Sequence, residues 1–306
     1  MVMAVAEDTA LSPITLSHNG LRFGALACGM TKNAGQPLVL CLHGFPDTAH
    51  SFRFLLPALA AAGYRAVAPM MRGYEPSSQP ADGDYLLTTL ARDVIGWADD
   101  LGADRVHLVG HDWGAAVSYL AGAMAPDRFY SLSTLAVPHA ARFADGIKAV
   151  PGQLLKSWYM TFFQLRGFAE RMVERNDWAL IKGLWQSWSP GYTLAPQDWA
   201  IMRDVFAAPG VKRAMLAYYR QNASPAVMFG LKKTEATALT CVPVPTLAIT
   251  GADDGCIDTR LYDHLFRKGD FPKGFMVERI AGAGHFAHLE KPEIIHALIL
   301  EWLGKN

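Results

Sequence analysis

The stretch "GHDWG" at residues 110–114 follows the apolar run "RVHLV" at 105–109 and precedes the helix-like segment "AAVSYLAGAMAP" at 115–126. A buried strand, a bend with small residues on both sides of an acid, and a helix form the nucleophile-elbow pattern. The small residues let strand and helix approach closely, and the bend strains the backbone of Asp112. The partial positive charge at a helix N-terminus would stabilise the carboxylate. The alternative is that Asp112 only caps the helix.

The rest of the chain alternates between strand-like and helix-like segments. Apolar strand-like runs occupy residues 37–44, 64–73, 105–112, 131–139, 245–254 and 275–285. Amphipathic helical patterns occupy residues 90–102 and 294–303, and residues 14–28 read as a hairpin that turns at Asn19-Gly20. The alternation predicts an α/β fold with a mostly parallel twisted sheet flanked by helices.

Residues 140–240 interrupt this alternation. They carry helical patterns and many tryptophans, and they lack a strand-like run of comparable strength. We therefore predict a core made of residues 1–139 and 241–306, with residues 140–240 inserted as a helical cap lobe. The alternative is that this segment extends the core itself.

Composition narrows the class of protein. The chain of 306 residues carries 28 basic and 28 acidic side chains, so nothing favours DNA, RNA or anionic lipid as a partner. The N-terminal residues lack a basic start and a long apolar stretch, so we expect no signal peptide. No uninterrupted run of about 18 apolar residues occurs, so we expect no membrane span. Cys28, Cys41, Cys241 and Cys256 are scattered without metal-ligand spacing, which favours a reducing, cytoplasmic location.

A second motif, "HGFPD" at residues 43–47, also stands at a strand end. A tight turn there would present the backbone N–H of Phe45 towards the "GHDWG" bend. The N–H of Trp113 would be a second donor, and two such donors form an oxyanion hole. The alternative is an ordinary strand-to-loop turn.

Two further motifs supply an acid and a base. "TGADD" at residues 250–254 offers Asp254 as the triad acid, with Asp253 as its rival. "GAGHFAHLEKPE" at residues 282–293 offers His285 as the base, whereas His288 is expected to be structural. A nucleophile, an acid and a histidine in this order form a catalytic triad. We assign no catalytic role to His111 or Asp47.

Over nearly its whole length the sequence resembles the α/β-hydrolases. "GHDWGA", "HGFPD" and "MRGYEPSS" (residues 71–78) resemble the epoxide hydrolase branch of that superfamily. The resemblance implies an α/β-hydrolase core with an inserted helical cap that carries two tyrosines. These hydrogen-bond the epoxide oxygen. The segment "WYMTFFQ" (158–164) puts the first at Tyr159, and "LAYYRQN" (216–222) puts the second at Tyr219, with Tyr218 where the family usually has tryptophan.

The resemblance also implies a reaction. Asp112 would open an epoxide through a covalent aspartyl ester, and water would release a vicinal diol. A serine would instead form a stable ether, so the aspartate points to attack on a saturated carbon. We expect a small, largely apolar epoxide, water, and no metal or organic cofactor. The alternatives are a haloalkane dehalogenase with the same nucleophile and a non-catalytic ligand-binding member of the fold.

Overall fold

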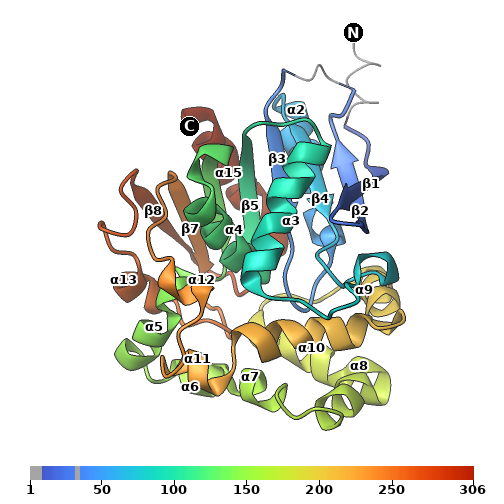
Figure 1. The fold of residues 1–306 in the computed structure, drawn as a ribbon, viewed down its shortest axis with the longest axis vertical. Coiled ribbons are helices and arrows are strands. Elements are labelled where there is room, and N and C mark those ends of the chain that lie inside the picture. The colour runs from blue at the N-terminus through green and yellow to red at the C-terminus, as the bar shows by residue number, and fades with distance from the viewer. Residues whose placement is uncertain (1–8, 32–34) are drawn as a thin grey trace.

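The computed structural model describes residues 9–31 and 35–306, which form an eight-stranded sheet with helices on both faces (Figure 1). The strand order is β1-β2-β4-β3-β5-β6-β7-β8. β2 pairs antiparallel with β1 and β4, and all other neighbouring strands pair in parallel. The predicted mostly parallel sheet is therefore confirmed. The strands are β1 (Ser12–His18), β2 (Leu21–Cys28), β3 (Leu38–Leu42), β4 (Arg65–Pro69), β5 (Val106–His111), β6 (Phe129–Leu135), β7 (Thr246–Gly251) and β8 (Phe275–Ile280).

The first two strands form the hairpin expected from the sequence. Asn19 and Gly20 connect them, and His18 pairs with Leu21. Both turn residues have positive φ, 51° and 77°, which is the conformation that a two-residue type I′ turn requires. Asparagine and glycine tolerate it better than other residues, so the local sequence fixes the turn.

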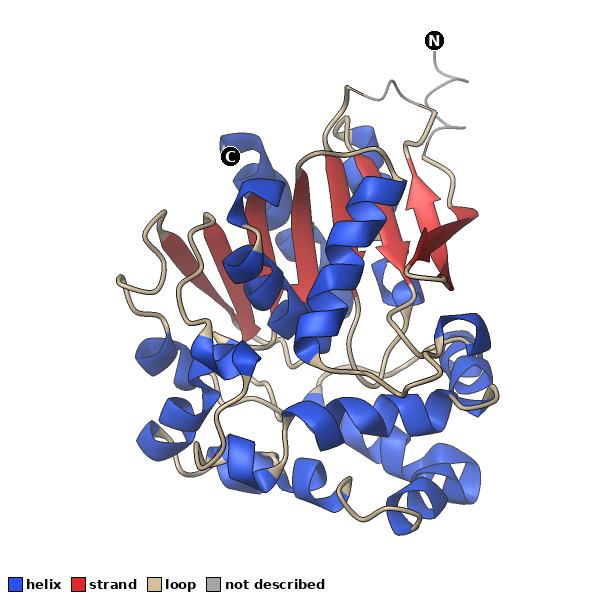
Figure 2. Ribbon diagram, viewed as in Figure 1, coloured by secondary structure: helices blue, strands red, loops and turns tan. Residues whose placement is uncertain are grey.

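Helices cover both faces of the sheet, as Figure 2 shows. α3 (Leu87–Asp100) and α4 (Trp113–Met124) lie on one face, and α2 (Leu55–Ala61) and α15 (Pro292–Lys305) lie on the other (Figure 1). All six residues of β5 are buried, because a central parallel strand is covered on both sides. The shorter elements of this part are η1 (Ala49–Phe52), η2 (Pro76–Ser78), η3 (Pro126–Arg128), α13 (Leu261–Leu265) and α14 (Ala287–Glu290).

The chain between β6 and β7 contains only helices and loops. In Figure 1 these helices lie across the carboxyl ends of the parallel strands. α8 has non-helical backbone at Arg175–Trp178, so it is two helical pieces joined at a kink. The elements of this helical segment are η4 (Ala140–Arg142), α5 (Phe143–Ala149), α6 (Gln153–Lys156), α7 (Trp158–Phe162), α8 (Phe168–Trp188), α9 (Pro196–Ala207), α10 (Val211–Asn222), α11 (Pro225–Met228) and α12 (Glu235–Ala238).

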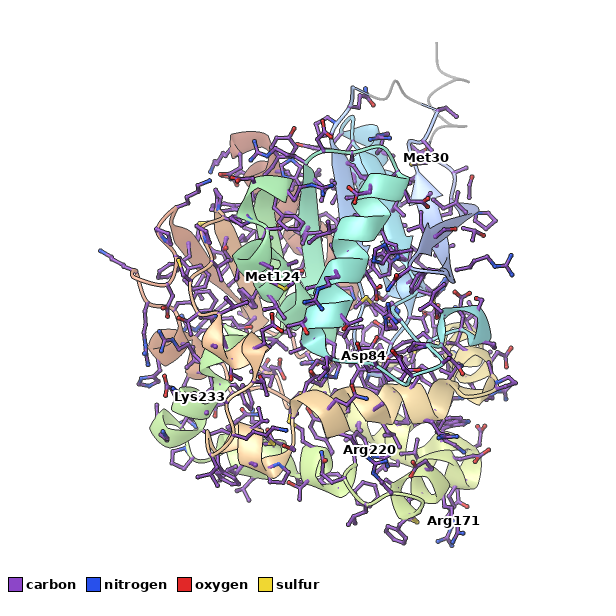
Figure 3. All side chains as sticks on the ribbon, viewed as in Figure 1. Met30, Asp84, Met124, Arg171, Arg220 and Lys233 are labelled. Atoms are coloured by element: carbon purple, nitrogen blue, oxygen red, sulfur yellow. The ribbon has the colours of Figure 1, made fainter. Side chains whose placement is uncertain are left out.

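Specific contacts fix the helical segment above the sheet. Within it, Arg220, labelled on α10 in Figure 3, donates to Glu170 of α8 at 2.6 Å. Towards the sheet, the indole N–H of Trp185 donates to the carbonyl of Pro46 at 2.9 Å, and its ring stacks on Phe286 at 3.4 Å. Among the described residues, no helix has both the length and the apolar character needed to cross a membrane.

Candidate active site

Asp112 lies at the bend between β5 and α4 with φ 50° and ψ −116°. The glycines on either side are required by close backbone contacts. A Cβ on Gly114 would lie 2.0 Å from the carbonyl oxygen of Leu42, and one on Gly110 would lie 2.3 Å from the carbonyl oxygen of Gly114. The carboxylate makes no capping hydrogen bond to α4, so helix capping does not explain this residue.

The Asp112 carboxylate instead faces the turn at residues 43–47. The backbone N–H of Phe45 donates to Asp112 Oδ1 at 2.8 Å. A Cβ on Gly44 would lie 2.4 Å from that oxygen and 2.5 Å from the nitrogen of Trp113. Both backbone nitrogens predicted for an oxyanion hole therefore lie close to Asp112 Oδ1. Asp112 Oδ2 points elsewhere, towards His285.

His285 stands between two carboxylates. Its Nδ1 lies 2.9 Å from Asp254 Oδ2, and its Nε2 lies 3.6 Å from Asp112 Oδ2. Asp254 Oδ1 accepts the N–H groups of Cys256 at 2.7 Å and Ile257 at 2.8 Å, which fix its orientation. Asp253, by contrast, is exposed. The structure thus places Asp254, and not its neighbour, against the histidine.

The two carboxylates determine the charge of His285. Burial alone would lower its pKa, but the charge and hydrogen bond of Asp254 and the charge of Asp112 raise the pKa of His285 to about 10. The imidazole therefore carries a proton as long as both carboxylates are charged. Esterification of Asp112 would remove one of these charges and make that proton easier to release.

Two tyrosines of the helical segment face Asp112. Tyr159 of α7 and Tyr219 of α10 are each 1% exposed, and their ring centroids are 5.6 Å apart. Burial raises the pKa of both phenols well above 10, and the charge of Asp112 raises it further. Both therefore hold their protons near neutral pH. The hydroxyl of Tyr219 has no hydrogen-bond partner in the part of the chain that the structure describes.

Tyr218 faces a different environment. Its hydroxyl donates to the backbone carbonyl of Arg72 at 2.7 Å, and its ring packs against Tyr74 and Tyr85. Adjacent residues of a helix point about 100° apart. For that reason only Tyr219 of this pair reaches the cavity above Asp112.

Asp112, Trp113, Tyr159 and Tyr219 line a cavity of about 540 Å³. Its walls are mainly apolar and include Leu87, Leu120, Val137, Phe143, Met160 and Ile257. None of the tryptophans of residues 150–200 lines this cavity. Trp185 and Trp188 pack against Phe286 and Tyr159, respectively, between the helical segment and the sheet.

One residue at the site was missed from sequence. The Sγ of Cys256 lies 3.3 Å from the hydroxyl of Tyr159, and the thiol is fully buried. Its position two residues after Asp254, in the loop that holds the acid, was the available signal. The contact itself could not be predicted, because Cys256 and Tyr159 are far apart in sequence.

A second group of buried polar residues adjoins His285. Asp47, His111 and His288 are each at most 3% exposed, and their ligand-type atoms lie within 4.8 Å of one another. His111 Nε2 is 3.0 Å from the carbonyl oxygen of His285. Burial lowers the pKa of His288 to about 3 and the pKa of His111 well below 6.5, and it raises the pKa of Asp47 to about 7. Both histidines are therefore neutral.

The chain is similar to known members of the alpha/beta hydrolase fold and to epoxide hydrolases. Residues 37–292 match the family model of the alpha/beta hydrolase fold. The chain is 31% identical to epoxide hydrolase 4 of Homo sapiens, over 96% of this chain and 78% of the human protein. It is 31% identical to the AB hydrolase superfamily protein YfhM of Bacillus subtilis (strain 168), over 94% and 96% of the two chains. The structure of an epoxide hydrolase from an endophytic Streptomyces superposes with a TM-score of 0.80 at 27% identity, over 96% and 95% of the two chains.

Proposed function

Because this chain belongs to the α/β-hydrolase family and, within it, to the epoxide hydrolase branch, we propose that it opens an epoxide to a vicinal diol through a covalent ester on Asp112. The observation that carries the mechanism is the convergence on one cavity of an Asp112 carboxylate and two buried phenols, with His285 behind that carboxylate. Residues 140–240 act in this proposal as the cap that supplies the phenols.

The first step forms the ester. Phe45 N–H holds Asp112 Oδ1, which leaves Oδ2 to bond to an epoxide carbon. The carbon–oxygen bond of the ring breaks, its electron pair stays on the epoxide oxygen, and that oxygen takes a proton from Tyr159 or Tyr219. The charge of Asp112 disappears as the ester forms, so one of the causes that raise the pKa of both phenols disappears with it. The phenols become stronger acids while the bond breaks.

The second step needs a neutral base. The proton on His285 passes to the tyrosinate, and the loss of charge on Asp112 favours this transfer. His285 Nε2 then removes a proton from water, and the water oxygen attacks the ester carbonyl. The N–H groups of Phe45 and Trp113 stabilise the oxyanion; one such donor is worth roughly 3–4 kcal/mol.

Collapse of that intermediate restores the enzyme. The ester bond breaks, Oδ2 departs with the diol, and the diol oxygen takes the proton from His285. Asp112 now holds the oxygen that came from water, and its carboxylic proton passes to His285. The cycle consumes one epoxide and one water, and Asp254 stabilises the imidazolium each time it forms.

A single turnover in ¹⁸O-water tests this route. With enzyme in excess over styrene oxide, we expect the label in the peptide that contains Asp112 and unlabelled oxygen in the diol. Label found entirely in the first diol would mean that water attacks the epoxide directly, and the ester would be excluded.

One observation favours a second candidate. The indole N–H of Trp113 is buried without a hydrogen-bond partner among residues 9–31 and 35–306, and a dehalogenase uses such a donor to bind halide. The two phenols favour an epoxide, since a departing halide needs no proton. Parallel incubations with styrene oxide and 1-bromobutane distinguish the two by diol and bromide release. A thermal shift without turnover of either would indicate a binding protein.

We further expect a cytoplasmic location.

A further inference from the structure

We propose that Asp47, His111 and His288 form an internal binding site for a divalent transition-metal ion such as Zn²⁺, and that occupation of this site inhibits the enzyme. The site adjoins His285, because His111 hydrogen-bonds the backbone carbonyl of that residue. Only the inhibition rests on the proposed function, whereas metal binding can be tested without it.

The cluster contains buried polar atoms that lack hydrogen-bond partners in the described part of the chain. Asp47 Oδ2, His111 Nδ1 and both ring nitrogens of His288 are fully buried, and none has a hydrogen-bond partner within the described ranges. Leaving one such buried group without a partner costs about 1–3 kcal/mol. One ligand-type atom from each of the three residues lies within 4.8 Å of the other two, so one shared ligand would satisfy them.

Hydrogen bonds orient His111 and Asp47 so that each keeps one atom free for a ligand. His111 donates its Nε2 proton to the carbonyl of His285, which accepts it at 3.0 Å, so the lone pair of Nδ1 faces the cluster. Metal-bound histidines usually donate their other N–H to a carbonyl or carboxylate in this way. Asp47 Oδ1 accepts the N–H of Thr48 at 2.7 Å, which leaves Oδ2 for the ligand.

The types of donor atom in the cluster also suit a metal ion. Two neutral imidazoles and one carboxylate are typical ligands of zinc and of other first-row transition metals. The ring centroids of His111 and His288 are 4.5 Å apart, and the ring of His288 stacks on Phe52 at 5.5 Å. Asp47 lies in the turn after β3, His111 is the last residue of β5, and His288 lies in α14, so three separate parts of the fold supply the donor atoms.

A small hollow adjoins one of the three residues. It has a volume of about 10 Å³ and is lined by Asp47, His50, Arg53 and Asp198 among others. Asp198 pairs with Arg53 at 2.7 Å. The hollow holds about one water molecule, so we expect slow metal uptake.

Occupation of the site should affect the second half of the reaction. The rings of His111 and His285 are 5.0 Å apart, and the hydrogen bond from His111 to the carbonyl of His285 links them directly. Coordination of the metal by His111 would displace this ring and, through the hydrogen bond, the backbone that holds the His285 imidazole between Asp254 and Asp112. The ester on Asp112 should therefore accumulate when metal is bound.

The test uses Co²⁺, whose visible absorption reports coordination independently of activity. The full chain is stripped with a chelator, incubated with Co²⁺, and then titrated with Zn²⁺ in competition. We expect one ion per chain, with a spectrum of nitrogen and oxygen ligands. Asp47→Asn and His288→Gln should each weaken binding by at least about tenfold. His107→Gln is the matched control, because His107 is a buried histidine that pairs with Ser131 at 2.8 Å, outside the cluster.

A competing site must be excluded. Asp254, Cys256 and His285 also lie close enough together to hold a metal. Binding there would give a sulfur-to-cobalt charge-transfer band, and Cys256→Ala would remove it. Such a band, or unchanged affinity in Asp47→Asn and His288→Gln, would overturn the proposal. Absence of stoichiometric binding would overturn it too and would leave water as the occupant.

The metal site and the proposed reaction can fail separately. Co²⁺ binding that depends on Asp47 in a protein without epoxide turnover would support the site and refute the function. Turnover that is unaffected by saturating Zn²⁺, with Co²⁺ bound at the cluster, would refute the inhibition alone.

Discussion

His285 Nε2 lies 3.6 Å from Asp112 Oδ2, while the other ring nitrogen is held at 2.9 Å by Asp254. The imidazole is thus fixed by Asp254 on one side and faces Asp112 on the other. It is too far from Asp112 for a short hydrogen bond, and it lies behind the carbon that an ester would present. This arrangement suits a base that activates water against an ester on Asp112.

The first prediction concerns this base. His285→Gln should still form the ester, because Asp112 and both phenols remain, but it should fail to hydrolyse it. Intact-protein mass spectrometry after incubation with styrene oxide should show the enzyme mass plus one substrate. Steady-state turnover at the parent rate would remove His285 from the mechanism.

The nucleophile gives the second prediction. Asp112→Ala should lower kcat by at least about 10⁴-fold, since it removes the only group proposed to bond to carbon. The folded state should persist, because Asp112 makes no cap bond to α4. Gas chromatography of the diol measures the turnover, and the circular dichroism spectrum checks that the variant is folded. Residual turnover above a few per cent would contradict it.

A third prediction separates the three tyrosines. Tyr159→Phe and Tyr219→Phe should each slow ester formation about tenfold, and the double variant should lose about 10²–10⁴-fold, because either phenol can supply the proton. Tyr218→Phe is the matched control, since its hydroxyl donates to the carbonyl of Arg72, away from the cavity. Stopped-flow fluorescence in single turnover measures the rate. A larger loss in Tyr218→Phe than in Tyr219→Phe would reverse the assignment.

The fourth prediction concerns stability and pH. The pKa of His285 is about 10 in the folded protein and about 6.5 when unfolded, so the folded state holds this proton more tightly. The resulting stabilisation is fully present below pH 6.5 and is lost as the pH rises through 10. Relative to His285→Gln, the parent's free energy of unfolding should fall by up to about 1.4 kcal/mol per pH unit across that window. Urea denaturation at pH 6, 8 and 10 measures the free energy of unfolding of both proteins. If the difference between parent and variant stays the same at all three pH values, the raised pKa is contradicted.

A fifth prediction concerns the bend itself. Gly114→Ala should destabilise the fold by several kcal/mol, about 3 or more, because its Cβ would lie 2.0 Å from the backbone oxygen of Leu42. Gly122→Ala in the same helix is the control. Its nearest contact would be the flexible side chain of Leu132 at 3.0 Å, and alanine is the better helix former. Thermal unfolding compares the two, and equal melting temperatures would contradict the steric argument.

Much of the fold was predictable because it depends on local pattern. The strand, bend and helix around Asp112 follow from an apolar run, two glycines and an apolar helix, and each acts over a few residues. The Asn19-Gly20 turn is equally local. The tryptophans of residues 150–200 show the limit, since composition indicates apolar burial but does not distinguish a pocket wall from packing.

Sequence alone therefore determined the α/β class, the bend that displays Asp112, and the types of residue available for chemistry. Tertiary structure alone showed that Asp254 and not Asp253 contacts His285, and that Tyr219 and not Tyr218 lines the cavity. Neighbouring residues share a sequence context but point in different directions, and only the packed chain shows which one faces His285 or the cavity. It also brought Asp47, His111 and His288 together, because contacts between residues far apart in sequence arise only when the chain folds and leave no signal at any one position.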